Sequence, residues 1–325
     1  MKTKILTALR EAGDYISGQQ LCEQLGVSRT AVWKVIKQLR EAGYQIVSVQ
    51  NKGYKLVEAP DILSEEELKS LRKTRWAGVE TRYYPVLDST NIKAGQLAQE
   101  GYPHGTLVVA DRQEAGRGRR GKGWSSPSGL NVYMTLMLKP KIAIGNASML
   151  TLVAALAVAQ AIRRQAQLEA GIKWPNDIVL SGKKVCGILT ELSVQIDYID
   201  HLVIGIGINV HNESFPEEIA QTATSLFLET GRHFSRAKVI EDVLEYFEQY
   251  YDVYLKTQDL SGLMEEYNAM LANRGKIVRV LDPKEPFEGV AIGIDERGEL
   301  LVNSEGEVRK VISGEVSVRG IYGYV

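Results

Sequence analysis

A stretch rich in glycine and arginine, GRGRRGKGW, constrains the fold more than any other part of the chain. It runs from Gly116 to Trp124 and contains both the G-x-G-x-x-G dinucleotide fingerprint and a Walker A loop that lacks only its final Ser or Thr. Both motifs require a helix to begin directly after the glycines, and the following SSPSG cannot begin one there. The stretch therefore argues against a Rossmann or P-loop nucleotide site. It predicts a flexible basic loop that grips an anion, the alternative being a loop whose charges are only solvated.

Length and composition bound the class of protein. The 325 residues suffice for two or three domains, and 39 basic against 40 acidic residues predict no bulk affinity for a polyanion or a membrane. Cys22 and Cys186 suggest neither a disulfide nor a metal site, which favours a reducing compartment. The longest apolar run, Met149 to Ile162, has about fourteen residues, too few to span a bilayer, and the N-terminus resembles no signal peptide. We expect a soluble, cytoplasmic protein without a membrane partner.

Residues 1–60 carry nine Lys or Arg against five Asp or Glu and predict a winged helix-turn-helix. A short helix stops at Gly26, Ser28 stands at an N-cap position, and a helix over 29–41 follows with a basic outer stripe. Two strands over 45–49 and 54–57 flank a glycine turn as the wing. The alternative is a small helical protein-interaction domain. The expected DNA contacts, to bases and phosphates, are Ser28, Arg29, Thr30, Trp33, Lys34, Lys37 and Lys52, with Lys55 beside them on the wing.

The rest of the chain predicts two further domains, so the fold class is multidomain α+β. After a linker at 59–61, residues 65–270 mix strands over 106–110, 132–138, 185–192 and 202–210 with helices over 147–164 and 236–256, as in an α/β catalytic domain. Ser64 and Glu67 have the form of a capping box at its first helix. Residues 273–325 predict a small SH3-like barrel with strands at 277–281, 287–294, 300–303, 308–312 and 316–319.

Three short segments of the central domain place polar side chains at the ends of predicted elements. Ser89 and Thr90 follow a strand-like run, where they either cap a helix or present hydroxyls to a ligand. The KWPND turn at 173–177 ends in Asp177, which either closes an ordinary turn or holds a hydrated Mg²⁺. Lys184 stands at the entrance of an apolar strand, where it is either solvated or aimed into a pocket to stabilise developing negative charge.

A fourth segment, Ile204 to Asn209, reads IGIGIN. On a strand, Gly205, Gly207 and Asn209 share one face and the isoleucines share the other. Glycines weaken a strand interior, so two on one face predict that something packs flat against the backbone. A flat polar ligand, such as a urea-like ring, would fit this face, and Asn209 would offer it a donor and an acceptor. The alternative is a close crossing of another backbone.

Taken together, these motifs resemble the bifunctional biotin–protein ligases that double as biotin operon repressors. The resemblance covers essentially the whole chain, namely the winged helix, DSTN at 88–91, the loop segment 113–123, KWPND at 173–177, KVCGI at 184–188, GIGIN at 205–209 and the small C-terminal barrel. It implies a central domain of the class II synthetase-like type that converts biotin and ATP, with Mg²⁺, to biotinoyl-5'-AMP.

The resemblance also implies which residues act. Lys184 and Arg119 would be catalytic, and Asp177 would be the metal ligand. The biotin pocket would be lined by Ser89, Thr90, Asn91, Gln113, Arg117, Gly118, Arg119, Lys184, Gly187, Gly205, Gly207 and Asn209. ATP and its adenine would contact Trp124, Arg120, Lys173 and Asn209. Trp124 is assigned to the adenine because the segment 220–226, where some relatives carry a tryptophan, has none.

The implied product is biotin joined to a lysine of the carrier domain of biotin-dependent carboxylases. The implied repressor is a homodimer that binds a palindromic operator, with biotinoyl-AMP as corepressor. Acyl-adenylate chemistry needs cations and a dry site rather than a protein nucleophile, and the sequence offers the cations. Two alternatives stay open. One is a lipoate–protein ligase, which the winged N-terminus and the basic loop disfavour, and the other is a non-catalytic, metabolite-sensing repressor.

Overall fold

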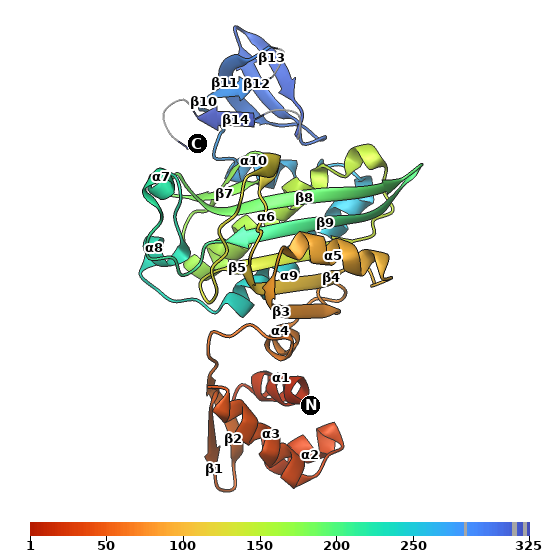
Figure 1. The fold of residues 1–325 in the computed structure, drawn as a ribbon, viewed down its shortest axis with the longest axis vertical. Helices are drawn as coiled ribbons and strands as arrows, with labels where there is room; N and C mark the ends of the chain where they lie inside the picture. Colours follow the sequence, from red (N-terminus) through yellow and green to blue (C-terminus); the bar gives the residue numbers. More distant parts are fainter. Residues whose placement is uncertain (283–284, 314–316, 321–323) are drawn as a thin grey trace.

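The computed structural model describes residues 1–282, 285–313, 317–320 and 324–325. Three sheets follow one another along the long axis of the molecule (Figure 1), with two, seven and five strands. The two-stranded sheet belongs to a helical N-terminal part, the seven-stranded sheet to a large central part, and the five-stranded sheet to the C-terminal part. The predicted multidomain α+β class is confirmed.

The N-terminal part is a winged helix-turn-helix, as predicted. It consists of α1 (Lys2–Ala12), α2 (Gly18–Leu25), α3 (Arg29–Glu41), β1 (Gln45–Val49) and β2 (Gly53–Glu58). Gly26 ends α2 in the left-handed region at φ 65°, and the Ser28 hydroxyl caps α3 by accepting from the Ala31 amide at 3.2 Å. Its apolar core is separate from that of the central part.

The predicted capping box at α4 (Glu65–Leu71) is only half present. Ser64 accepts from the Glu67 amide at 3.1 Å, but the Glu67 carboxylate does not return to the cap. It accepts two hydrogen bonds from Arg10 of α1, at 2.6 and 2.8 Å, and one from the Tyr44 hydroxyl at 2.7 Å. Glu67 is 1% exposed, so this paired buried charge joins the winged helix to the central part at a fixed point.

The central sheet has the order β3-β4-β5-β9-β8-β7-β6. Only β3 and β4 run parallel, and each of the other neighbouring pairs is antiparallel. The strands are β3 (Thr81–Leu87), β4 (Thr106–Gln113), β5 (Val132–Leu138), β6 (Gly171–Lys173), β7 (Asp177–Leu180), β8 (Lys183–Gln195) and β9 (Tyr198–Ile208). The helices of this part are α5 (Thr90–Gln99), α6 (Met149–Ala166), α7 (Glu217–Ala220), α8 (Leu226–Thr230), α9 (Arg236–Thr257) and α10 (Met264–Met270), with 3-10 turns at Arg119–Gly121 and Ile144–Asn146.

Alternate residues of the strands send apolar side chains to opposite faces of the sheet. Val108, Met137 and Val203 pack against α5, whereas their neighbours belong to the main core with α6 and α9. The face that carries α5 is therefore the less crowded one, and the pocket described below lies on it. The overlay of α5 on β4, β5 and β9 is visible in Figure 1.

Helix α6 is the core helix that the sequence predicted, but the expectation that its apolar segment is too short to span a bilayer was wrong. The segment Ile144–Ala166 has 23 residues, and an 18-residue window of it has a mean hydropathy of 1.6, which by length and composition would allow it to cross a membrane. Of that window 72% is buried inside the protein, where the helix packs against α9 and the sheet. Burial against its own protein, rather than shortness, identifies it as a core element.

The C-terminal part is an antiparallel sheet in the order β13-β12-β11-β10-β14. Its strands are β10 (Ile277–Leu281), β11 (Phe287–Ile294), β12 (Leu300–Ser304), β13 (Glu307–Val311) and β14 (Ser317–Gly320). These match the five predicted strands, except that Val316, where the last was expected to begin, lies outside the described residues. Within the described strands no pairing between β13 and β14 closes the sheet into a barrel.

Candidate active site

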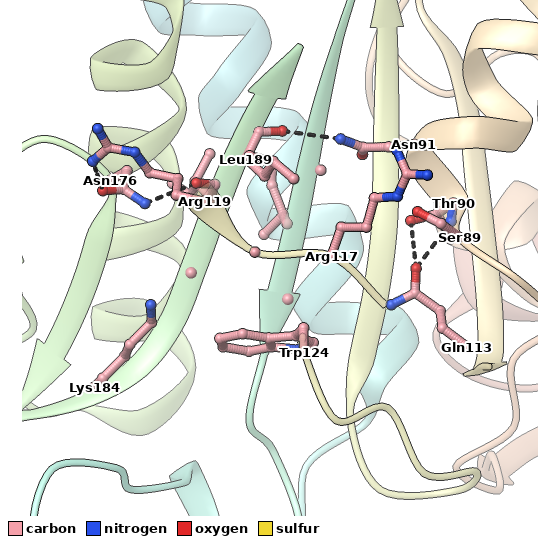
Figure 2. Close-up of a pocket in the computed structure, with 16 residues that line it drawn as sticks. Ser89, Thr90, Asn91, Gln113, Arg117, Arg119, Trp124, Asn176, Lys184 and Leu189 are labelled. Atoms are coloured by element: carbon pink, nitrogen blue, oxygen red, sulfur yellow. Dashed lines mark hydrogen bonds between the residues drawn. The ribbon is translucent and has the colours of Figure 1, made fainter. Parts of the chain in front are cut away.

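A cavity opens on the α5 face of the central sheet, where the basic loop folds over β8 and β9 (Figure 2). Together with its open mouth it contains about 460 Å³ of empty space. Its lining brings together most of the predicted site residues from five separate segments: Ser89, Thr90, Asn91, Gln113, Arg117, Gly118, Arg119, Trp124, Asn176, Lys184, Gly187, Ile188, Leu189, Gly205, Ile206 and Gly207.

One end of the cavity is a preorganised polar cluster. The Gln113 amide oxygen accepts from the Thr90 amide at 2.9 Å and from the Thr90 hydroxyl at 3.1 Å, and its nitrogen donates to Ser126 at 2.9 Å. Ser89 occupies the N-cap position of α5 without making a capping hydrogen bond, so the plain helix-cap alternative does not describe it. Neutral donors and acceptors fixed in this way suit an uncharged polar ring.

Asn91 forms the wall beside this cluster. Its nitrogen donates to the Leu189 carbonyl at 3.2 Å and to Glu191 at 2.7 Å, and its oxygen accepts from the Thr135 hydroxyl at 2.7 Å. It is 5% exposed and lies so close to Gly205 that a Cβ there would come within 2.2 Å of its oxygen. The Asn91 side chain is therefore a fixed part of the wall.

The glycine face of β8 and β9 is covered, but not as the sequence suggested. Gly187 pairs with Gly207 across the two strands, and the indole of Trp124 lies over both. A Cβ on Gly207 would meet the Trp124 ring at 2.7 Å, and one on Gly187 would meet it at 3.0 Å. The flat group against these two glycines is the protein's own tryptophan, so the prediction of a bare floor for a ligand ring was wrong there. The Trp124 ring nitrogen is buried and finds no hydrogen-bond partner among the described residues.

The basic loop brings two arginines to different sides of the cavity, Arg119 beside Asn176 and Arg117 beside Asn91 (Figure 2). Arg119 donates to the Asn176 side chain at 2.9 Å, and the Arg117 guanidinium lies 4.0 Å from Glu191. Burial lowers the pKa of Arg119 from its usual value, as expected where few groups compensate its charge. Figure 2 shows both guanidinium groups above the strands. Arg120, with φ 57°, turns instead toward a neighbouring open groove of about 990 Å³.

Lys184 enters the cavity floor from β8 and is held by Asp177. Its ammonium lies 2.6 Å from one Asp177 oxygen and 5.2 Å from the Trp124 ring, while the other Asp177 oxygen accepts from the Tyr324 hydroxyl at 2.5 Å. The Lys173 ammonium lies 3.4 Å from the Tyr324 ring, and burial lowers the pKa of Lys173 to about 8. Lys173 and Asp177 thus stand behind Lys184 rather than in the cavity lining.

The metal role predicted for Asp177 stays a prediction. In this structure its carboxylate pairs with the Lys184 ammonium and accepts from the Tyr324 hydroxyl, and a metal ion would compete with both. Asn209 is placed differently from the prediction. It follows the end of β9, donates to the Thr224 carbonyl at 3.0 Å, and is absent from the cavity lining.

Sequence reasoning missed Asn176 and Glu191, the partners of the two loop arginines. Asn176 lies inside the KWPND motif, where a polar side chain next to Asp177 was a usable signal. Glu191 lies within β8, outside the KVCGI motif, so no predicted motif pointed to it.

The predicted DNA contacts lie on one exposed surface of the winged helix. Ser28, Arg29, Thr30, Trp33, Lys34, Lys37 and Lys52 are all exposed, and Trp33 is 57% exposed. The Lys37 ammonium lies 5.8 Å from the Trp33 ring, and Lys52 lies 5.6 Å from Tyr15. Lys55 is held by Asp14 at 2.9 Å, so in this structure its charge is partly neutralised.

The comparisons with known proteins match all three parts. The family model of the biotin/lipoate A/B protein ligases matches residues 83–209, a helix-turn-helix model matches 2–55, and the model of the biotin protein ligase C-terminal domain matches 275–319. The chain is 40% identical over 321 residues to the bifunctional ligase/repressor BirA of Bacillus subtilis, covering 98% of each chain. The chain belongs to the BirA family of bifunctional ligase/repressors.

Two further relatives agree. The chain is 32% identical over 331 residues to the bifunctional ligase/repressor BirA of Escherichia coli, covering 97% of this chain and 96% of that one. The structure of a biotin protein ligase from Aquifex aeolicus in complex with biotin and ATP superimposes with a TM-score of 0.67 at 32% identity, covering 74% of this chain and 99% of that one. The cavity lies within the span of the ligase family model.

Proposed function

We propose that this protein joins biotin to ATP, forms biotinoyl-5'-AMP and pyrophosphate, and transfers the biotinoyl group to one lysine of a carboxylase carrier domain. The observation that supports it best is the polarity of the cavity. A neutral hydrogen-bonding cluster around Thr90 and Gln113 lies at one end, and the cations of Arg119 and Lys184 lie at the other. Biotin has the same polarity, with an uncharged ureido ring at one end and a carboxylate at the other.

The proposed chemistry needs no protein nucleophile. The biotin carboxylate attacks the α-phosphate of ATP, the bond to pyrophosphate breaks, and an acyl-adenylate remains. Lys184 and Arg119 offset the negative charge that gathers among these groups in a site closed by the loop. The acceptor lysine then attacks the acyl carbon and AMP leaves. Of the remaining predicted residues, Arg117 and Gly118 close over the ligand, and Trp124 separates the biotin tail from the adenine.

Magnesium enters this proposal with ATP rather than on the protein. Mg²⁺ is commonly held by substrate phosphates and water, with few carboxylates. Since Asp177 is engaged by Lys184 and Tyr324, it acts here as the support of Lys184. Arg120, at the neighbouring groove, and Lys173, behind Lys184, add positive charge around the phosphates.

The lipoate alternative is less favoured than biotin because a winged helix and a biotin protein ligase C-terminal domain accompany the ligase domain. The domain limits that we propose are 1–60, 65–270 and 273–325. The deciding experiment incubates the protein with ATP, Mg²⁺ and either biotin or lipoate and detects the acyl-adenylate by mass spectrometry. Lys184→Ala is expected to abolish it, and Lys183→Ala, which changes the preceding lysine outside the cavity lining, is the control. Adenylate from lipoate alone would refute the assignment, and none from either acid would favour a non-catalytic sensor.

We propose further that the protein is a cytoplasmic repressor that binds a palindromic operator as a homodimer, with the adenylate as corepressor. The exposed basic surface of α3 and the wing supports DNA binding. The outer half of β8 supports dimerisation, because among the described residues no strand pairs with its second edge beyond Gly187. That edge carries Leu192 and Val194, which are 41% and 51% exposed.

The same edge borders the open groove beside Arg120, so we place the carrier domain there when the protein is a monomer. Sedimentation with and without biotin and ATP tests the dimer. Leu192→Lys is expected to prevent ligand-linked association while adenylate still forms. A variant that dimerises like the wild type would refute this interface.

A further inference from the structure

Arg236, the first residue of α9, is a buried cation between two carboxylates that belong to different parts of the chain. It is 4% exposed. Its Nε donates to Asp61 at 2.8 Å, and one terminal nitrogen donates to Asp111 at 2.8 Å. A buried guanidinium is stable only while its charge stays paired, so the positions of both carboxylates depend on it.

Asp61 belongs to the linker that joins the winged helix to the central part. Its second oxygen accepts from the Arg236 backbone amide at 2.8 Å, and its carbonyl accepts from the same guanidinium at 3.3 Å. The carboxylate therefore sits at the N-terminus of a 22-residue helix, where negative charge is favoured. His211 lies 3.5 Å from the same carboxylate. Arg236 thus fixes the path of the linker.

Asp111 lies on β4 and holds the chain just after the basic loop. Its carboxylate accepts from the Ser128 hydroxyl and from the Gly129 amide at 3.1 Å. Two residues later on the same strand, Gln113 accepts from Thr90 and donates to Ser126 at 2.9 Å. The base of the basic loop is therefore anchored to β4 at two points. Gln113 is the anchor inside the cavity, and Asp111 is the anchor that pairs with Arg236.

We propose that Arg236 is a positioning residue that couples the ligand loop to the linker of the DNA-binding part through Asp111 and Asp61. The inference rests on the proposed function. When the loop closes on the adenylate, the base of the loop keeps Asp111 in place, and the Asp111–Arg236–Asp61 contacts hold the linker. Coupling of this kind is reciprocal, so operator DNA also slows escape of the adenylate.

The two carboxylates allow each half of the coupling to be cut separately. Asp111→Asn leaves the linker contacts intact and loosens the loop, so the adenylate is expected to dissociate at least tenfold faster. Asp61→Asn leaves the loop contacts intact, so adenylate formation is expected to stay within twofold of the wild type. In Asp61→Asn the gain in operator affinity that the adenylate confers on the wild type is expected to disappear. Glu65→Gln, which alters a half-buried carboxylate of α4 that pairs with Lys69 on the same helix, is the control.

Adenylate release is measured by quenched-flow chase, operator affinity by fluorescence anisotropy at fixed salt, and folding of each variant by thermal unfolding. If Asp61→Asn keeps the full effect of the adenylate on DNA, or Asp111→Asn releases adenylate at the wild-type rate, the inference is overturned. If a variant changes both readouts only in step with a lowered Tm, the cluster is merely structural and the inference is again overturned. A wild-type protein that forms no adenylate would instead refute the proposed function, and that result is distinct from the other two.

Discussion

Gly205→Ala tests how tightly the wall of the cavity is built. A methyl group at this position would lie 2.2 Å from the Asn91 oxygen and 2.9 Å from its Cγ, so Asn91 must move by roughly an ångström. That shift breaks its hydrogen bonds to Leu189, Glu191 and Thr135. At about 1 kcal/mol net for each bond, the central part loses about 3 kcal/mol of stability. The Thr135 hydroxyl also lies 2.8 Å from the Thr90 hydroxyl, so the polar end of the cavity is disturbed as well.

The assay combines urea unfolding with biotin-dependent pyrophosphate exchange. We expect the free energy of unfolding to fall by about 3 kcal/mol and the KM for biotin to rise roughly tenfold or more. Gly145→Ala is the matched control, because a Cβ there meets no atom within 4 Å. Gly207→Ala on the same strand displaces Trp124 instead, and is expected to raise the KM for ATP more than that for biotin. Wild-type stability and KM in Gly205→Ala would refute the reasoning.

Three further predictions concern the loop, the buried lysine and the DNA surface. Arg119→Ala removes the donor to Asn176 at 2.9 Å, so adenylate should escape and label lysines indiscriminately. Clean transfer by that variant would contradict the role, and Arg112→Ala, on an exposed side chain, is the control. Between pH 8 and the ordinary lysine pKa of 10.5 the unfolded chain holds a proton that folded Lys173 has lost, so the contribution of Lys173 to stability rises with pH, whereas the raised pKa of the buried Cys186 thiol acts in the opposite direction. In urea unfolding from pH 8 to about 9.5, the slope of stability against pH should be less positive for Lys173→Met than for the wild type, and an equal slope would mean that Lys173 is charged when folded. Lys34→Ala should weaken operator binding and lower the slope of log K against log salt by about 0.9, and an unaltered slope would exclude a phosphate contact.

Local signals were sufficient for the elements whose ends are set by a single residue. Gly26 and Ser28 end and begin helices where the sequence predicted, and β5, β10 and β11 have the predicted bounds. Strand β8 extends beyond its predicted bounds at both ends, and β9 begins four residues earlier and ends two residues earlier than predicted, because the exposed residues between Leu192 and Leu202 do not keep the apolar pattern. Strands β6 and β7 have three and four residues, too few for a period to be recognised.

Long-range contacts explain where local chemistry predicted the wrong partner. The Glu67 carboxylate has the correct spacing for a capping box, yet it binds Arg10, 57 residues away in the chain. A charge-assisted pair with Arg10 and Tyr44 is stronger than a bond to one cap amide, so the tertiary contact wins. The Asp177 carboxylate likewise has a distant partner, since it accepts from Tyr324, 147 residues away in the chain, besides pairing with Lys184. A sequence motif gives the spacing of such a side chain but not its competing partners.

The glycines of β9 show how far a sequence pattern can be taken. Two glycines on one strand face correctly predicted a flat group against the backbone, because only close packing compensates for the side chains that the strand lacks. The sequence could not say which group, since Trp124 lies 83 residues before Gly207 and on a loop. The indole on Gly187 and Gly207 and the amide on Gly205 together occupy the floor, so a ligand must lie along these side chains rather than on the strand itself. The glycines therefore act on ligand binding through Trp124 and Asn91. Replacing either of these two side chains should change which ligand the cavity binds.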